Sequence, residues 1–233
     1  MAHISKNTIS PDYPRIPHLD SRISQMTHDD ILPDCAITFP ISCFLQEKVD
    51  GANCGVSWDN GPILRNRNFI LKKGYSNIHT PAKIQFKSAW NWVHQHEGDI
   101  KEIESRWEGK ITIYGEWMYF KHSLFYDKLP DLFLAYDIYS VDDKKFISLS
   151  LVKELIKGLN ICFINYSTEN FNSISDIKKK SEVISNYRNG YAEGIVLKTV
   201  SGNFIKSTYK VVNQFFNRRE DFNEGQIERN ILL

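Results

Sequence analysis

The sequence predicts an α+β fold in which antiparallel sheets dominate. Short apolar or alternating runs, typical of strands, occur along most of the chain, and helical patterns come between them without strict strand–helix–strand alternation. With 233 residues, 42% of them hydrophobic and 13% aromatic, the chain is long enough to bury a sizeable core. The formal net charge is +1, so any contact with nucleic acid must come from a local patch.

The predicted strands begin after an irregular lead-in, rich in Pro, Asp, His and Ser, over residues 1–35. The runs ISCFLQEKV, NCGVSW and PILRNR follow between residues 36 and 67, and the turn DNG between the last two indicates a hairpin. KITIYGEWMYF and DLFLAYDIYS read as further strands, and ICFI as a short one. EGIVLKTV and FIKSTYKVV, joined by SGN, predict a final hairpin.

The helical patterns lie between these strands. After Pro81, apolar residues recur at the spacing of one helix face, and this spacing continues through Ile100, Ile103 and Trp107. SLSLVKELIKGL predicts a short helix with a serine cap and a glycine near its end. SISDIKKKSEVISNY predicts another helix, and we interpret its lysine run as a solvated face.

The cysteines and the termini indicate a compartment. None of the four cysteines forms a C-x-x-C pair, and we interpret Cys43 and Cys54 as small core residues in a reducing environment. The N-terminus lacks an apolar signal core, and no apolar run approaches membrane-spanning length. We therefore expect a soluble, intracellular, cytoplasmic protein without membrane contact.

A lysine and an aspartate stand close together in the strand-like run EKVDGANCGV, residues 47–56. A buried charge is costly unless it is paired or chemically used, so either a hairpin solvates both groups or Lys48 is a nucleophile. Five further motifs follow in order: RNRN (65–68), YGEWMY (114–119), LAYDIY (134–139), EGIVLK (193–198) and FIKSTYK (204–210).

These six motifs, in this order, resemble those of the covalent nucleotidyltransferases, which include ATP-dependent DNA ligases, RNA ligases and mRNA-capping guanylyltransferases. K-x-D-G or E-G-x-x-x-K alone is a weak signal, and the ordered set is far more specific. YPRIPHLDSR and HSLFYDKLP also look like RNA-ligase-2-like adenylyltransferase domains. The resemblance spans Lys48 to Lys210 and implies a nucleotidyltransferase (ATP-grasp-like ligase) fold, with antiparallel sheets flanking the nucleotide pocket and surface helices.

The resemblance implies an ATP-dependent RNA ligase. A lysine would attack ATP to form lysyl-AMP, pass the AMP to an RNA 5′-phosphate, and let the 3′-OH seal the strand. The cofactors would be ATP and Mg²⁺ or Mn²⁺, and the partners RNA ends. A GTP-dependent capping guanylyltransferase, a minimal DNA ligase and a non-catalytic module that binds RNA ends remain alternatives.

The catalytic residues implied by the motifs are lysines. Lys48 is the candidate nucleophile, and its amine must be unprotonated to attack. A free lysine has a pKa of about 10.4, so it is mostly charged at neutral pH. Burial and neighbouring cations favour the neutral form, and Lys198, Lys206 and Lys210 would supply positive charge for the phosphates. In the family the last motif has closely spaced basic residues, whereas Lys206 and Lys210 are four apart. We keep both and favour Lys210.

Acidic and amide side chains are implied for the metal and the phosphates. Glu193 is the best candidate for a metal carboxylate, and Glu116 is its companion, on a metal or on the ribose hydroxyls. Asp50, in the motif with Gly51, would orient the loop or the nucleotide. Asn53 would contact metal-bound water or phosphate.

Four further residues are implied for the base, the ribose or a phosphate. Tyr136 matches the aromatic residue that stacks on the base in the family, and Glu47 would read the adenine edge. In RNRN we favour Arg67 over Arg65 for a phosphate or ribose contact, and strand alternation would set both on one face.

The resemblance also predicts how the chain is organised. We expect a nucleotidyltransferase domain over residues 36–215 and a short tail over 216–233, too short for an OB-fold. A helper protein or domain, or the lead-in, would then assist substrate binding. The basic residues expected to hold the RNA backbone are Lys206, Lys210, Arg218 and Arg219.

Overall fold

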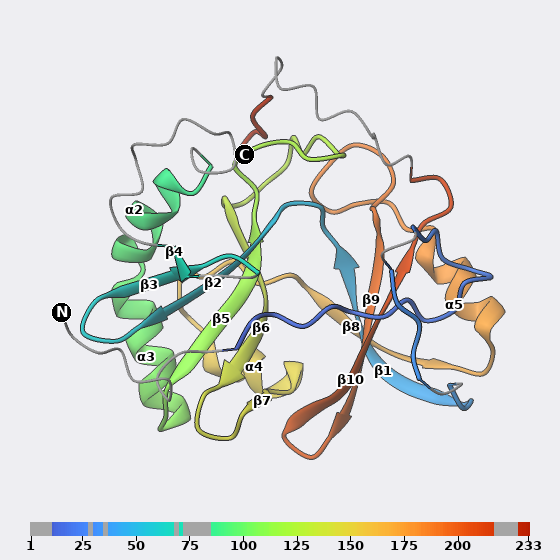
Figure 1. The fold of residues 1–233 in the computed structure, drawn as a ribbon, viewed down its shortest axis with the longest axis horizontal. Helices are drawn as coiled ribbons and strands as arrows, with labels where there is room; N and C mark the ends of the chain where they lie inside the picture. Colours follow the sequence, from blue (N-terminus) through green and yellow to red (C-terminus); the bar gives the residue numbers. More distant parts are fainter. Residues whose placement is uncertain (1–10, 28–29, 35–36, 68–69, 72–84, 217–227) are drawn as a thin grey trace. The chain divides into compact units, whose positions relative to one another are not determined.

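The computed structural model describes residues 11–27, 30–34, 37–67, 70–71, 85–216 and 228–233. These residues form ten strands and four helices, labelled as in Figure 1, and the strands make two antiparallel sheets. The chain divides into two compact units. Unit 1 takes residues 1–14, 52–119 and 133–163, and unit 2 takes residues 15–51, 120–132 and 164–233. The predicted α+β class is confirmed.

Unit 1 holds the larger sheet, with strand order β4-β3-β2-β5-β6-β7. The strands are β2 (Ala52–Trp58), β3 (Pro62–Arg65), β4 (Ile70–Leu71), β5 (Ile111–Trp117), β6 (Phe133–Ser140) and β7 (Lys145–Phe146). The helices of this unit are α2 (Lys87–Gln95), α3 (Glu97–Trp107) and α4 (Leu149–Leu155). In Figure 1, α2 and α3 lie beside β3 and β2, so they bury one face of the sheet.

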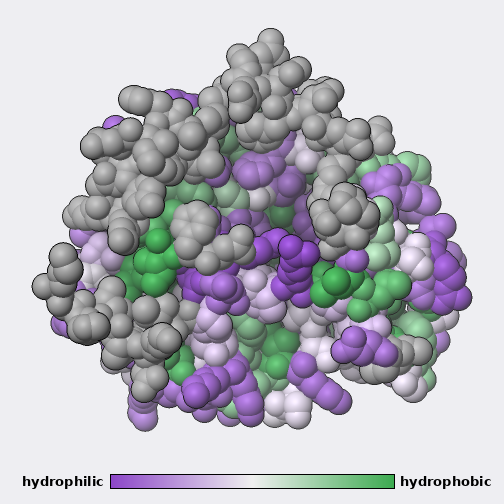
Figure 2. All heavy atoms as spheres, viewed as in Figure 1, coloured by the Kyte–Doolittle hydropathy of each residue, from purple (hydrophilic) through white to green (hydrophobic). Residues whose placement is uncertain are grey.

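Unit 2 holds the smaller sheet, with strand order β10-β9-β1-β8. The strands are β1 (Ile41–Lys48), β8 (Tyr166–Phe171), β9 (Gly194–Ser201) and β10 (Phe204–Val212), and the helix is α5 (Ile174–Ser181). Alternate residues of β1, such as Cys43 and Leu45, enter one core with Ile195, Leu197 and Val211. Hydrophilic residues dominate the right-hand edge of the face in Figure 2, where α5 lies in Figure 1.

A segment without regular structure lies along the free edge of β10. We call residues 15–27 and 30–34 the N-terminal strap. Lys210 N donates to Pro17 O at 2.9 Å, and Leu19 N donates to Lys210 O at 2.9 Å. Leu19 and Ile23 also enter the core of unit 2. The strap is therefore part of the packed unit, and the domain boundary at residue 35 stays a prediction.

Most predicted elements are confirmed. β2 and β3 pair around the turn at Asn60, which has φ 54°, and β9 pairs with β10. ICFI was wrong as a strand, because among the described residues it makes only the isolated bridge between Phe163 and Ala135. The helix predicted over SISDIKKKSEVISNY ends at Ser181. β8 was missed because YSTENF is polar and mostly exposed, so it carries little apolar alternation.

The cysteine interpretation holds where the structure describes it. Cys43 and Cys54 are buried and free, and burial raises the pKa of the Cys43 thiol to about 11. In the described part of the chain, no helix has the length and apolarity needed to cross a bilayer. The intracellular location stays a prediction.

Gly194, in the motif EGIVLK, is needed for packing. It pairs with Lys48 on β1 and with Val212 on β10. A Cβ at this position would lie 2.1 Å from Val211 O and 2.9 Å from Val212 Cα. Backbone atoms cannot move aside as the end of a flexible side chain can, so only glycine lets β9 and β10 approach.

We expect Gly194→Ala to lower the free energy of unfolding by about 3 kcal/mol, the upper part of the range for overpacking. Denaturant unfolding measures the change. Gly98→Ala is the matched control, because Gly98 lies in α3 with open space around it. Gly98 lies in the first turn of α3, and the control should gain up to about 1 kcal/mol of stability because alanine is a better helix former than glycine. Wild-type stability in Gly194→Ala would contradict the packing argument.

Candidate active site

The candidate nucleophile pairs with a carboxylate in unit 2. Lys48 Nζ lies 2.5 Å from Glu193 Oε2, and the two side chains are 23% and 5% exposed. Lys48 ends β1, and Glu193 immediately precedes β9. The antiparallel register of Lys48 with Gly194 brings them together across 145 residues of sequence. The solvated-hairpin interpretation of Lys48 is therefore wrong.

Lys198 is a second buried cation on β9. It is 1% exposed, and its Nζ donates to Gln46 Oε1 at 2.6 Å. Gln46 Nε2 in turn donates to Ile164 O at 2.9 Å, which fixes the orientation of the amide. A neutral amide thus meets the ammonium group, and the positive charge of Lys198 is not cancelled by this contact.

The two lysines of β10 have different surroundings. Lys206 is exposed beside a bulge between Ile205 and Ser207. Lys210 is partly buried, and its Nζ donates to Asp30 Oδ1 of the strap at 2.7 Å. Burial lowers the pKa of Lys210, Asp30 raises it, and the charge of Lys48 lowers it further. Lys210 therefore lies within electrostatic reach of the candidate nucleophile.

Glu47 holds a loop that follows α5. Its carboxylate accepts from the Ser185 hydroxyl, from Asn186 N at 2.8 Å and from Asn186 Nδ2 at 3.0 Å. Burial raises the pKa of Glu47 although these hydrogen bonds and Arg188 oppose the shift. Glu47 therefore holds the loop at Ser185 and Asn186 in place. A contact of Glu47 with the edge of adenine stays a prediction.

Asp50 fixes the loop that follows Lys48. Its Oδ2 accepts from Ser123 N at 2.6 Å and Leu124 N at 3.0 Å, while its own N donates to Tyr126 Oη at 2.8 Å. These contacts fix the loop, and the predicted role of Asp50, to orient the loop or the nucleotide, stays a prediction. Gly51 follows in the same loop, and the stretch HSLFYDKLP supplies all three partners.

Unit 1 contains a separate cluster of predicted site residues. Asn53 on β2 pairs in register with Glu116 on β5, so their side chains share one face. Asn53 Nδ2 lies 2.6 Å from Tyr136 Oη on β6. Burial, with the charges of Glu116 and Asp137, raises the pKa of Tyr136 well above its ordinary value. The phenol is therefore neutral at physiological pH.

Tyr13 packs against this cluster and was not predicted. Its ring meets that of Tyr136 edge to face at a centroid distance of 5.2 Å, and its hydroxyl donates to Asp137 Oδ2 at 2.7 Å. Tyr13 lies in a stretch that reads as irregular, and no local pattern marks it as a partner of β6.

The arginine prediction rested on a wrong premise. β3 ends at Arg65, so strand alternation does not extend to Arg67. Arg65 is 4% exposed and pairs with Asp12, whereas Arg67 is exposed. Arg67 lowers the pKa of Tyr136, so its charge acts on that cluster. The preference for Arg67 stays a prediction. Arg218 and Arg219 lie outside the described residues.

A divalent cation would find few protein ligands here. Within the described ranges, no group of three or more His, Cys, Asp or Glu side chains could hold a metal ion. Mg²⁺ and Mn²⁺ accept hard oxygen ligands, and Mg²⁺ is often held by one or two carboxylates with phosphate and water. Asn53 Oδ1 is buried without a hydrogen-bond partner in the described part of the chain. Asn53 Oδ1 and a carboxylate oxygen therefore suit a metal ion that binds together with the phosphates of a nucleotide.

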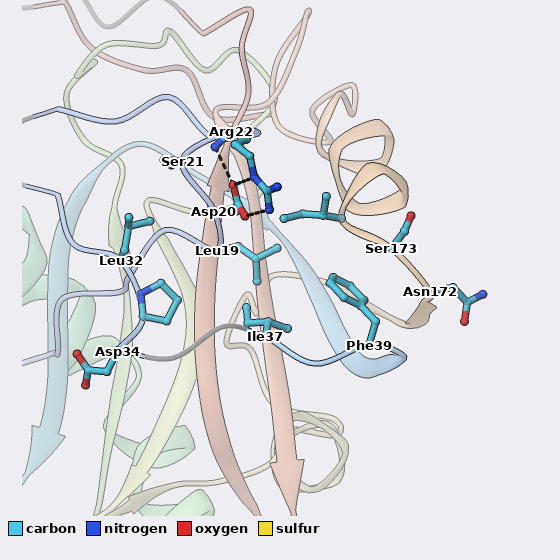
Figure 3. Close-up of a pocket in the computed structure, with 12 residues that line it drawn as sticks. Leu19, Asp20, Ser21, Arg22, Leu32, Asp34, Ile37, Phe39, Asn172 and Ser173 are labelled. Carbon is cyan, nitrogen blue, oxygen red and sulfur yellow. Dashed lines mark hydrogen bonds and ion pairs between the residues drawn. The ribbon is translucent and has the colours of Figure 1, made fainter.

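The structure also has a pocket that none of the predicted site residues lines. It has a volume of about 580 Å³ and lies in unit 2, against the strap and the start of α5. Figure 3 shows Leu19, Ile37 and Phe39 on its apolar side, and Asp20 bound to Arg22 at its rim. The predicted chemistry is not in this pocket.

The sequence-predicted residues thus form two groups. Unit 2 brings together Lys48, Glu193 and Lys210, with Lys198 on the neighbouring strand, and unit 1 brings together Asn53, Glu116 and Tyr136. The sequence did not reveal the residues that hold them: Asp30, Gln46, Ser185, Asn186, Tyr126 and Tyr13. Each lies far along the chain from its partner or outside any motif, so no spacing marks it.

Comparisons with known proteins support the predicted fold. The RNA ligase family model matches residues 41–212. The Naegleria gruberi RNA ligase with PPi is 16% identical with a TM-score of 0.57, covering 91% of this chain and 61% of that one. A mutant of that ligase with AMP and Mn gives 16% identity, a TM-score of 0.59, and coverage of 91% and 61%.

Another mutant of that ligase, with ATP and Mn, gives 16% identity, a TM-score of 0.53, and coverage of 74% and 49%. At this identity the likeness establishes the fold alone, and the predicted nucleotidyltransferase-type ligase fold is confirmed. This chain spans about half to three fifths of the length of these ligases. The curated proteins give no match.

Proposed function

Because the chain belongs to the RNA ligase family, we propose that it is an ATP-dependent RNA ligase whose nucleophile is Lys48. The observation that carries the proposal is the Lys48–Glu193 pair, which is partly buried and is held by the pairing of β1 with β9. At 2.5 Å from Lys48 Nζ, the carboxylate of Glu193 is placed to take the proton from the ammonium group before Lys48 attacks.

In the first step, the unprotonated Nζ of Lys48 attacks the α-phosphorus of ATP. A nitrogen–phosphorus bond forms, the bond to the pyrophosphate oxygen breaks, and lysyl-AMP remains. Glu193 Oε2, 2.5 Å from Nζ, is close enough to accept the ammonium proton. The charges of Lys198 and Lys210 would stabilise negative charge on the phosphoryl oxygens.

Two transfers complete the reaction. A 5′-phosphate oxygen of RNA attacks the phosphorus of lysyl-AMP, which releases the Lys48 amine and leaves AMP on the RNA end. The 3′-hydroxyl of the other end then attacks the 5′-phosphate, forms the phosphodiester and releases AMP. The bond energy of ATP thus passes through one lysine to the RNA.

Further residues would hold the nucleotide. A divalent ion, Mg²⁺ or Mn²⁺, would supply neutralising charge for the departing pyrophosphate, and the solved ligase structures with ATP or AMP and Mn support this. In unit 2, Glu193 would hold it. In unit 1, Asn53 would contact metal-bound water or phosphate, and Glu116 would contact a metal or the ribose hydroxyls. Tyr136 would stack on the base, Glu47 would read its edge, and Asp50 would keep the Lys48 loop in place.

The substrate proposal is RNA ends, one with a 5′-phosphate and one with a 3′-hydroxyl, as the family implies. This assigns the chain to RNA repair. Because the chain covers 49–61% of the matched ligases, we propose that a helper protein or domain adds substrate contacts.

We expect incubation with α-labelled ATP and a divalent ion to label the chain, and Lys48→Ala to abolish the label. GTP should give no label. Lys180→Ala is the matched control, because Lys180 also pairs with a carboxylate, Glu169, at 2.9 Å but is 46% exposed. A gel of the denatured proteins reads the result. A fully labelled Lys48→Ala chain would exclude Lys48 as the nucleophile.

Glu193→Gln and Lys198→Met should each slow single-turnover adenylylation by about two to three decades. The reason is that one good electrostatic contact in a closed site contributes about 2.7–4 kcal/mol. Glu169→Gln, at the exposed partner of Lys180, serves as the control and should keep the wild-type rate. Near-normal rates in both site variants would refute the assigned roles.

The adenylylated chain should seal a break faster when the 3′ end is ribose than when it is deoxyribose. The 2′-hydroxyl adds one donor and one acceptor where few other features separate RNA from DNA. Sealing should also fall steeply as salt rises, because contacts to the backbone phosphates are electrostatic. Matched nicked substrates at limiting enzyme provide the measurement. Equal rates on both ends would point to the wrong branch of the superfamily.

A further inference from the structure

Asp30 in the strap is held on several sides at once. Its Oδ2 accepts from Thr27 N at 3.0 Å and from Thr27 Oγ1 at 3.1 Å. The same oxygen lies 3.2 Å from His18 Nε2, and Oδ1 accepts from Lys210 Nζ at 2.7 Å. The carboxylate is 13% exposed. These contacts hold the Asp30 carboxylate in one orientation. The carboxylate in turn holds the ammonium group of Lys210.

A chain of contacts anchors the strap to β10 beside Lys210. Ser24 Oγ accepts from Val212 N at 2.8 Å and also bonds the buried ring of His18 at Nδ1. The backbone of the strap brackets Lys210, through Pro17 O and Leu19 N. The segment that supplies Asp30 is therefore fixed by the strand that supplies Lys210.

The charge of Lys210 depends on this arrangement. Burial lowers the pKa of Lys210, and the nearby charge of Lys48 lowers it further, while Asp30 and Glu193 raise it. Burial would raise the pKa of Asp30, but hydrogen bonds from Lys210 and Thr27 outweigh it and hold that pKa well below its usual range. Without Asp30, the balance at Lys210 shifts toward the neutral amine, which cannot stabilise phosphate charge.

We propose that Asp30 is a positioning residue that holds Lys210 in place as a charged ammonium group for the nucleotide phosphate. The strap is then a part of the catalytic frame, although it lies outside the six motifs. This inference rests on the proposed function of Lys210. Asp30 acts through Lys210 and touches no reacting atom itself.

A double-mutant cycle on single-turnover adenylylation tests the proposal. Asp30→Asn should slow the reaction about 10- to 100-fold in the wild-type chain and cause no further loss in a Lys210→Met chain. Asp30→Glu should recover part of the rate. Asp20→Asn is the matched control, because Asp20 lies on the same strap and pairs with Arg22 at the surface (Figure 3). Equal losses from Asp30→Asn in both backgrounds would overturn the proposal.

A second measurement does not need activity. Acylation of individual lysines, followed by peptide mass spectrometry across a range of pH, reports the protonation of Lys210. Among the described residues, the charged groups that act on Lys210 are Asp30, Lys48 and Glu193, and His18 also interacts with it. Its reactivity profile should move to lower pH in Asp30→Asn, and an unmoved profile would overturn the proposal. The two proposals can fail separately. If the Lys210 profile moves in Asp30→Asn but the wild-type chain takes no label from ATP, the proposed function is contradicted and the role of Asp30 in charging Lys210 is not.

Discussion

The antiparallel register of β1 with β9 is the constraint on which the candidate site of unit 2 depends. It sets Lys48 opposite Gly194 and so brings its ammonium group to Glu193. The same pairing puts Gln46 next to Val196 and carries its amide to Lys198. A slip of one residue would turn each of these side chains to the opposite face of the sheet. The buried core on the other face opposes such a slip, so packing and chemistry share one alignment.

Gly194 shows how closely this alignment is built. Its missing Cβ allows β10 to approach within a distance that no other residue permits, and β10 carries Lys210. The strap closes the free edge of β10 and supplies Asp30 to Lys210. Three lysines thus come to adjacent strands, and their contacts differ: a carboxylate for Lys48, an amide for Lys198 and a strap carboxylate for Lys210. Buried cations destabilise the folded chain unless each has a polar or charged partner. A group of cations like this one also suits a polyanionic ligand.

Much of this could be predicted from the sequence because it lies in local patterns. The hairpins follow from turn residues between alternating runs, and the order of the motifs indicated the family. The predictions that were wrong or missing concern residues whose partners lie far along the chain. β8 is polar, and it forms a strand because it pairs with the edge of β1. β3 ends at Arg65, whereas the sequence pattern predicted that the strand alternation continues to Arg67. The contacts of Glu47 with Ser185 and of Lys210 with Asp30 cross 138 and 180 residues of sequence, and no spacing reveals them.

Peptide mapping of the chain after incubation with ATP and a divalent ion tests the central claim most directly. The claim is that the β1–β9 register makes Lys48, and no other lysine, the acceptor of AMP. The account predicts one modified peptide that contains Lys48, with AMP on its Nζ. AMP on Lys198, Lys206 or Lys210 instead, or an unmodified chain under conditions that keep it folded, would contradict it.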